Sequence, residues 1–224
     1  MVDVVTNLEK IKRNISEACG RSNRRSDELT IIGVTKYVTI ERTVEAIEAG
    51  IENIGENRNE GFLEKYSEIG TKAKWHFIGS LQSRKVKDII DKIDVLHSLD
   101  RLSLAKEINK RASNQVDCFI QVNVSGEESK HGLAPEEVMP FIENLTTYEK
   151  VHIIGLMTMA PHIDDEEKIR SVFRRLAELR DSIQSKNYDH APCSFLSMGM
   201  SNDYEIAIEE GATHIRIGSN LVGN

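Results

Sequence analysis

The sequence predicts a single (β/α)8 barrel in which an extra helix precedes the first strand. Short apolar runs of β-forming residues recur eight times, helical patterns lie between them, and no linker or low-complexity stretch divides the chain. Strands that are apolar on both faces and alternate with helices are typical of parallel sheets built from βα units. The 224 residues suit a small barrel, since this fold begins at about 200 residues. We therefore expect one domain over residues 1–224.

The extra helix at the start of the chain is amphipathic. Its apolar side chains recur at helical spacing and fall on one face. They are Leu8, Ile11, Ile15 and Cys19. Because the sequence ends shortly after the eighth predicted strand, we expect this helix to occupy the place of the eighth barrel helix.

The predicted strands are short and bounded by polar or glycine residues. They cover residues 29–35, 52–54, 74–78, 94–99, 116–124, 151–157, 193–197 and 213–217. The alternative fold is a doubly wound open sheet. A dinucleotide-binding sheet of that kind carries a GxGxxG motif after its first strand, and this sequence does not.

The predicted helices have recognisable ends. Gly50 and Gly70 each follow an apolar repeat and suit the position just after a helix. Pro135 suits the first turn of another helix. The longest apolar stripe covers residues 169–183.

Composition argues against several classes of protein. The net charge is −7, from 36 acidic and 29 basic side chains, whereas a nucleic-acid-binding domain usually has a basic excess. No apolar run approaches the roughly 18 residues of a membrane span, and the mixed polar N-terminus is no secretory signal. We expect no nucleic acid, no membrane and a cytoplasmic location.

The metal-binding side chains show no pattern typical of a site. The three cysteines lie far apart without a CxxC motif, and the seven histidines are scattered. A sparse, odd number of cysteines fits reduced thiols. We therefore expect no bound metal.

Lys36 is the most informative residue in the sequence. It directly follows the first predicted strand and should point into the barrel mouth, where active sites of this fold lie. It can be a surface lysine whose stem covers apolar groups. It can also be a nucleophile, because an ammonium in a confined cavity is more easily deprotonated and the amine then condenses with an aldehyde.

The segments after the last two predicted strands are rich in serine and glycine. Residues 197–201 read Ser-Met-Gly-Met-Ser and lead into a helical pattern, and residues 216–219 read Arg-Ile-Gly-Ser. The loops after strands seven and eight are the usual phosphate-binding place in this fold, and helix N-termini favour anions. These two segments predict a phosphate site.

A lysine that forms imines and a phosphate site at one barrel mouth together indicate pyridoxal 5′-phosphate (PLP). The remaining alternative is a barrel that binds another phosphate ester, with Lys36 only as a counter-charge. Absorbance distinguishes the two, because an imine of PLP colours the protein and a salt bridge does not.

The chain resembles the pyridoxal phosphate homeostasis protein family over nearly its whole length. The segments that carry the resemblance are Val34-Thr35-Lys36, Ile54-Gly55-Glu56-Asn57, Trp75-His76-Phe77-Ile78-Gly79-Ser80-Leu81-Gln82, Gln121-Val122-Asn123, Lys130-His131-Gly132, Gly155-Leu156-Met157, Leu196-Ser197-Met198-Gly199-Met200-Ser201 and Arg216-Ile217-Gly218. Together these motifs are highly specific.

The resemblance implies a barrel like the N-terminal domain of alanine racemase, which is fold type III among PLP proteins. It implies a Schiff base between PLP and Lys36 and places Arg216 at the pyridine nitrogen. The other residues implied for the cofactor site are Asn57 and Met157 beside the ring and Ser197, Ser201, Gly218 and Ser219 around the phosphate. Two positions depart from the family pattern: Arg84 replaces a common asparagine, and Val222 replaces a common phenylalanine.

Arg216 also bears on whether the protein is an enzyme. A guanidinium only donates hydrogen bonds, so a ring nitrogen facing it stays unprotonated and PLP becomes a weaker electron sink. Racemases add a tyrosine from a second domain, and this sequence ends at Asn224. Tyr37 and Tyr204 are more suited to packing than to catalysis.

We therefore expect a protein of intracellular PLP homeostasis without robust turnover, a monomer or else a dimer, that supplies PLP-dependent apo-enzymes. The alternative is a single-domain, PLP-dependent amino-acid racemase or a related enzyme. Its base would be Cys193, His76 or a residue of a partner chain. We expect His76 to pack or hydrogen-bond inside the barrel instead.

Overall fold

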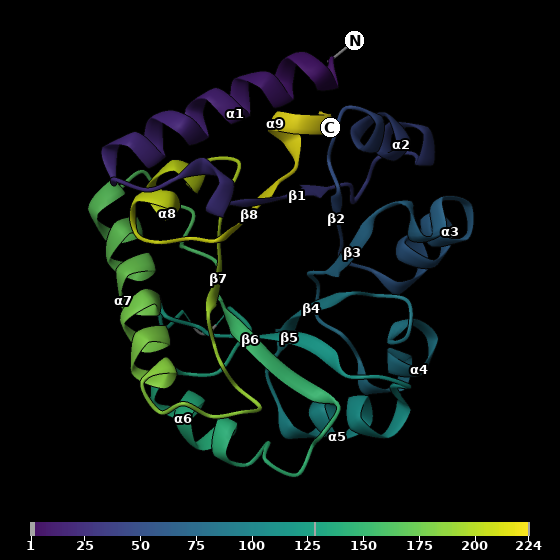
Figure 1. Ribbon diagram of the computed structural model, residues 1–224, viewed down its shortest axis with the longest axis vertical. Helices are drawn as coiled ribbons and strands as arrows, with labels where there is room; N and C mark the ends of the chain where they lie inside the picture. The colour runs from purple at the N-terminus through teal and green to yellow at the C-terminus, as the bar shows by residue number, and fades with distance from the viewer. Residues whose placement is uncertain (1–2, 128, 224) are drawn as a thin grey trace.

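The computed structural model describes residues 3–127 and 129–223 and contains a closed parallel barrel (Figure 1). Its strands follow one another in sequence order around the barrel. They are β1 (Thr30–Val34), β2 (Asn53–Glu56), β3 (Lys74–Phe77), β4 (Val95–Leu99), β5 (Val116–Gln121), β6 (Val151–Met157), β7 (Phe195–Met200) and β8 (His214–Ile217). Because β1 pairs with β8 as well as with β2, the predicted barrel is confirmed and the open sheet is excluded.

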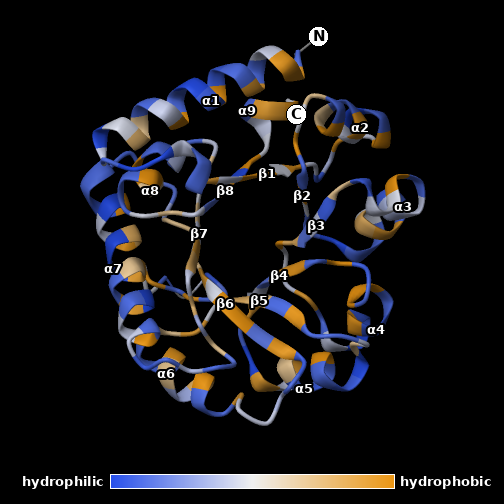
Figure 2. Ribbon diagram, in the orientation of Figure 1, coloured by the Kyte–Doolittle hydropathy of each residue, from blue (hydrophilic) through white to orange (hydrophobic). Residues whose placement is uncertain are grey.

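Helices cover the outside of the barrel (Figure 2), and most of their buried residues are apolar. They are α1 (Val4–Arg21), α2 (Ile40–Glu48), α3 (Asn59–Ile69), α4 (Val86–Ile89), α5 (Leu102–Arg111), α6 (Pro135–Glu143), α7 (Glu166–Gln184), α8 (Tyr204–Glu209) and α9 (Ser219–Val222). Pro135 begins α6, and Gly50 follows α2 with a φ of +105°, as their positions in the sequence predict.

The leading helix α1 fills the gap in the ring of helices beside β8. Asp3 caps it by accepting hydrogen bonds from the N–H groups of Val5 and Thr6, and its predicted apolar face is buried. The helix packs against α8, α9 and α2 (Figure 1). The spacing of apolar residues in the sequence did not predict α9, because four residues are too few to show a helical period.

The seventh strand differs most from its predicted bounds. It runs from Phe195 to Met200, whereas the sequence predicted 193–197. The backbone of Cys193 is left-handed, with a φ of +47°, so an extended strand cannot begin there. The later end is important for function because it carries the strand to the rim where Ser201 follows.

No helix in the described ranges, 3–127 and 129–223, is both long and apolar enough to cross a membrane. The three cysteine thiols are free and buried.

Three histidines lie inside the barrel. His76 and His97 are 5.1 Å apart between ring centroids, and His214 lies 6.3 Å from His76. Burial lowers the pKa of His76 to about 3 and that of His214 to about 4, and it lowers the pKa of His97 well below its usual range. All three imidazoles are therefore neutral at pH 7.

These neutral histidines predict a loss of stability in mild acid. The unfolded chain takes up protons near pH 6.5, while the folded chain does not, so the free energy of unfolding falls as the pH falls below 6.5. Between pH 7.5 and 5.5 we expect a loss of roughly 1 kcal/mol for each histidine. Urea denaturation across this range measures it, and most carboxylates stay ionised there.

A His214→Phe variant is the matched control. The ring keeps the aromatic contacts with Phe119 and Phe195, but it cannot take up a proton. The change in unfolding free energy with pH should become about one third smaller. An unaltered pH dependence would contradict this account, whatever the variant's stability at pH 7.5.

Candidate functional site

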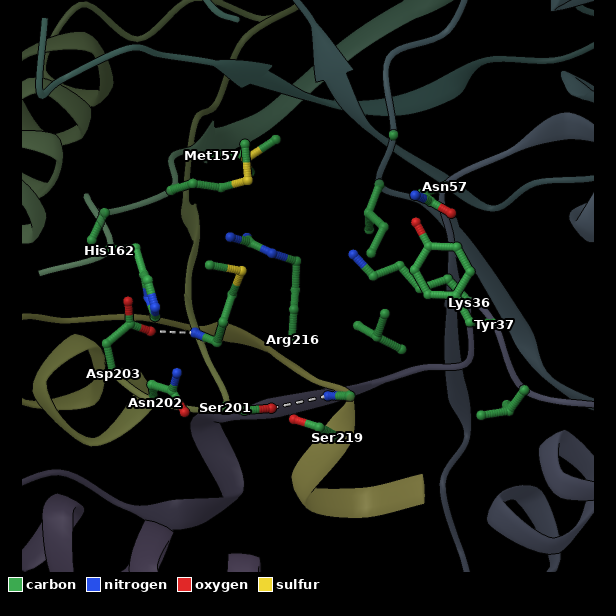
Figure 3. A pocket seen from close by; sticks show the side chains of 18 of the residues that line it. Lys36, Tyr37, Asn57, Met157, His162, Ser201, Asn202, Asp203, Arg216 and Ser219 are labelled. Atoms are coloured by element: carbon green, nitrogen blue, oxygen red, sulfur yellow. Dashed lines mark hydrogen bonds between the residues drawn. The ribbon is translucent and has the colours of Figure 1, made fainter. Parts of the chain in front are cut away.

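A cavity of about 680 Å³ opens at the carboxyl ends of the strands. The structure brings seven of the predicted site residues to its wall: Lys36, Asn57, Met157, Ser201, Arg216, Gly218 and Ser219. Figure 3 shows Lys36 and Arg216 extending into the cavity from different sides, with Ser201 and Ser219 beside them. The size lies within the range of about 300–1,000 Å³ that small-molecule sites occupy.

Ser197 is the one predicted site residue that does not line the cavity. It is completely buried in β7, and its Oγ accepts a hydrogen bond of 2.5 Å from Arg216. This position follows from strand geometry, since Ser197 lies within the strand and the rim begins beyond it. We expect Ser197 to act on Arg216 and not on a phosphate group.

Lys36 lies at the cavity wall and is solvent-exposed. Its Nζ is 5.6 Å from the centre of the Tyr37 ring, and Arg58 approaches the same ring at 5.6 Å. From the sequence we expect the lysine to point into the barrel mouth, and the structure places it there, but more exposed to solvent than the confined cavity assumed for a nucleophile. Tyr37 holds a left-handed backbone, with a φ of +72°, which is uncommon outside glycine and often marks functional sites.

A buried ion pair supports the backbone next to Lys36. The Nζ of Lys65 donates to Glu56 Oε1 at 2.6 Å and to the carbonyl oxygen of Thr35 at 2.5 Å. The hydroxyl of Thr35 donates to the same Glu56 oxygen at 2.7 Å. Both charged side chains are almost fully buried. This cluster, which sequence reasoning missed, fixes the end of β1 from which Lys36 extends.

Arg216 is buried at the side of the cavity. Its guanidinium donates to Ser197 Oγ and, at 2.9 Å, to the carbonyl oxygen of Thr158. Burial lowers the pKa of Arg216 to about 10, and the nearby carboxylate of Asp203 opposes this shift. The side chain remains a cation and a hydrogen-bond donor at neutral pH.

The turns after β7 and β8 are tied to each other. The N–H of Gly218 donates to Ser201 Oγ at 3.3 Å, and Asn220 donates to the carbonyl oxygen of Ser201 at 2.8 Å. Gly199 brings the first turn close to α8: its φ is +90°, and a Cβ there would lie 2.6 Å from the Cβ of Ala207. Only glycine allows this approach.

Asp203 is a further cavity residue that the sequence did not single out. Its Oδ1 accepts a 2.5 Å hydrogen bond from the N–H of Met200, and His162 lies beside it in Figure 3. Burial raises the pKa of the Asp203 carboxyl. An aspartate at the start of a helix is such a common cap that no sequence signal separated it from that role.

Three of the side chains considered for catalysis, those of His76, Cys193 and Tyr204, do not line the cavity, whereas Tyr37 lines it and is exposed instead of packed. His76 is buried and hydrogen-bonds inside the barrel, as expected, and Cys193 is completely buried. Burial raises the pKa of the Cys193 thiol to about 12. Tyr204 is buried, and its hydroxyl accepts a hydrogen bond from Asn14.

The two departures from the family pattern also lie off the cavity wall. Arg84 is exposed and donates to Gln82, and Val222 is a buried residue of α9. No cluster of His, Cys, Asp or Glu among the described residues is placed to hold a metal ion.

Comparison with known proteins assigns the chain to a family. The family model described as the alanine racemase N-terminal domain matches residues 6–224. The pyridoxal phosphate homeostasis protein of Aquifex aeolicus is 43% identical over 220 residues, which cover 96% of each chain. The Escherichia coli K12 protein of that name is 32% identical and covers 100% of this chain and 97% of its own. This chain belongs to the alanine racemase N-terminal domain family and, within it, to the pyridoxal phosphate homeostasis proteins.

Solved structures agree with this assignment. PipY of Synechococcus elongatus, solved with PLP bound, superposes with a TM-score of 0.81 at 27% identity and covers 93% of this chain and 100% of its own. Alanine racemase of Corynebacterium glutamicum superposes with a TM-score of 0.70 over 98% of this chain and 60% of its own. At 12% identity, that second likeness concerns the fold alone.

Proposed function

We propose that this protein binds PLP as a Schiff base on Lys36 and serves intracellular PLP homeostasis without robust catalytic turnover. The observation that carries the proposal is the shared cavity. Lys36, Arg216 and the linked turns of Ser201 and Gly218 lie around a space of about 680 Å³. These groups fit an aldehyde, a pyridine nitrogen and a phosphate, respectively.

Lys36 supplies the nucleophile. When PLP is bound, the Lys36 amine would hold it by condensing with its aldehyde, with loss of one water molecule. The buried Glu56–Lys65 pair keeps the end of β1 in place, so the flexible part is the Lys36 side chain. Its exposure at the mouth lets PLP enter and leave without opening of the barrel.

The linked turns after β7 and β8 supply the phosphate site. The first turn of a helix leaves N–H groups without partners in the helix, and α9 begins at Ser219, directly beside the cavity. The hydroxyl groups of Ser201 and Ser219 add further donors. PipY, which shares this fold at 27% identity, was solved with PLP bound, and this supports a ligand that carries a phosphate group.

Arg216 supports binding more than catalysis. PLP supplies an electron sink for carbanions when its ring nitrogen is protonated, and a guanidinium that only donates keeps that nitrogen unprotonated. The names of the relatives as homeostasis proteins support the same conclusion. We expect the protein to act in the cytoplasm as a monomer and to supply PLP to apo-enzymes that depend on it.

Variants of the phosphate turns test this function. Ser201→Ala and Gly218→Ala are expected to weaken PLP binding about tenfold or more while changing pyridoxal binding little, because only PLP carries a phosphate. Titrations followed by absorbance give both dissociation constants.

Gly218 is suitable for this test because the protein itself has room for a methyl group. A Cβ there would lie 3.6 Å from Val34, an ordinary contact distance. A loss of binding for PLP and not for pyridoxal would therefore result from crowding of the phosphate group and not from a clash within the protein. Equal losses for PLP and pyridoxal would show that these residues act through folding and would contradict the phosphate site.

A further inference from the structure

A chain of buried hydrogen bonds runs from Arg216 through the interior of the barrel. Arg216 contacts Ser197 Oγ at 2.5 Å, and Ser197 Oγ contacts His97 Nδ1 at 2.9 Å. His97 Nε2 lies 2.8 Å from His76 Nδ1, and His76 Nε2 lies 3.0 Å from Asn53 Oδ1. Ser197, His97 and His76 are almost fully buried, so water does not replace these bonds.

The positions of the protons in this chain follow from its two ends. Arg216 can only donate, so Ser197 Oγ accepts from it and has its own proton left to donate to His97 Nδ1. His97 Nε2–H then donates to His76 Nδ1, and His76 Nε2–H donates to the Asn53 carbonyl oxygen. In this direction each link of the chain joins one donor to one acceptor, and the Ser197 hydroxyl is satisfied both as acceptor and as donor.

The opposite direction leaves one group unsatisfied. If the Asn53 amide were turned and each histidine donated toward Arg216, Ser197 Oγ would accept from both His97 and Arg216. Its own proton would then have no acceptor, since Ser197 Oγ contacts only these two groups in the described part of the chain. A buried hydroxyl without a partner has lost its hydrogen bonds to water and gained none in return, which favours the first direction.

We propose that these five side chains form one hydrogen-bond relay, directed from Arg216 to Asn53, that holds the Arg216 guanidinium in its orientation toward the cofactor ring. Arg216 acts on PLP, and Ser197, His97, His76 and Asn53 are positioning residues. The low pKa values of both histidines agree with neutral rings. The effect on PLP rests on the proposed function, whereas the direction of the relay does not.

The direction is tested by ¹⁵N NMR of the histidine side chains in the protein without PLP. We expect His76 and His97 to carry a proton on Nε2 and none on Nδ1 at pH 7. A proton on Nδ1 of His97 would overturn the relay. This measurement stands even if PLP does not bind, so it separates a failure of the relay from a failure of the proposed function.

The link to the cofactor is tested with Ser197→Ala and two ligands, PLP and its analogue with a C–H group in place of the ring nitrogen. Loss of the bond to Arg216 should weaken PLP binding on the order of tenfold to a hundredfold. The analogue, which has no ring nitrogen for Arg216, should bind both proteins alike. An equal loss of affinity for PLP and the analogue, or no loss for either, would contradict the positioning role.

Two further variants keep the test independent of folding. Ser98→Ala removes another buried hydroxyl, one that has no hydrogen-bond partner among the described residues. This variant should bind PLP and the analogue as tightly as the parent protein does. Ser197→Cys keeps a weaker donor and acceptor of similar shape and should give an intermediate loss for PLP. A loss with Ser98→Ala as large as that with Ser197→Ala would contradict the relay.

Discussion

Lys36→Ala is expected to abolish the yellow colour that the protein retains after it is mixed with PLP and dialysed. Lys36 is the amine at the cavity wall, and an alanine there cannot form the covalent link. Borohydride reduction followed by peptide mass analysis should find the cofactor on Lys36 in the parent protein and on no peptide of the variant. Residual PLP should bind only through the phosphate turns and Arg216, and dialysis should remove it.

Lys74→Ala is the matched control for this variant. Lys74 is an exposed lysine at the start of β3, at the opposite end of the barrel from the cavity. Its loss should leave colour and mass gain unchanged. A parent protein that remains colourless with added PLP, or a Lys36→Ala protein that is still labelled by borohydride, would contradict a Schiff base on Lys36.

Lys65→Met is expected to have the largest effect on stability. It leaves Glu56 as a buried charge without its partner, because both side chains of this pair are almost fully buried. Removing one partner of such a pair typically costs about 3–5 kcal/mol of unfolding free energy. Urea denaturation at pH 7.5 measures the difference from the parent protein.

The double variant Glu56→Gln/Lys65→Met separates charge from packing. The glutamine oxygen can still accept from the Thr35 hydroxyl, and no buried charge remains. Stability should therefore recover by more than half relative to Lys65→Met. A double variant as unstable as Lys65→Met would show that the ion pair is unimportant and that packing of the lysine stem decides the result.

The barrel could be predicted from the sequence because its signals are local. Alternating apolar strands and helices with glycine or proline at their ends are visible within short windows, as at Gly50 and Pro135. The end points of strands depend on single backbone conformations. The left-handed Cys193 and the one-turn helix α9 leave no periodic pattern, so the bounds of β7 and the last element were missed.

The site could be predicted in part for a related reason. Parallel strands bring their carboxyl ends to one rim, so Lys36, Ser201 and Gly218 could be placed together from their positions alone. The residues that support this site could not be predicted from sequence position. Lys65 reaches the rim from α3, and His97 reaches Ser197 across the barrel, so both contacts depend on the three-dimensional arrangement.

The central claim is that the protein carries PLP and does not turn over amino acids. The most direct test incubates the PLP-loaded protein in deuterated water with alanine, serine and other amino acids of both hands. Deuterium at Cα and inversion of configuration are then measured against free PLP at the same concentration. We expect rates no higher than those of free PLP. Turnover approaching the roughly 1–10³ s⁻¹ of ordinary enzymes would contradict the account and identify a racemase.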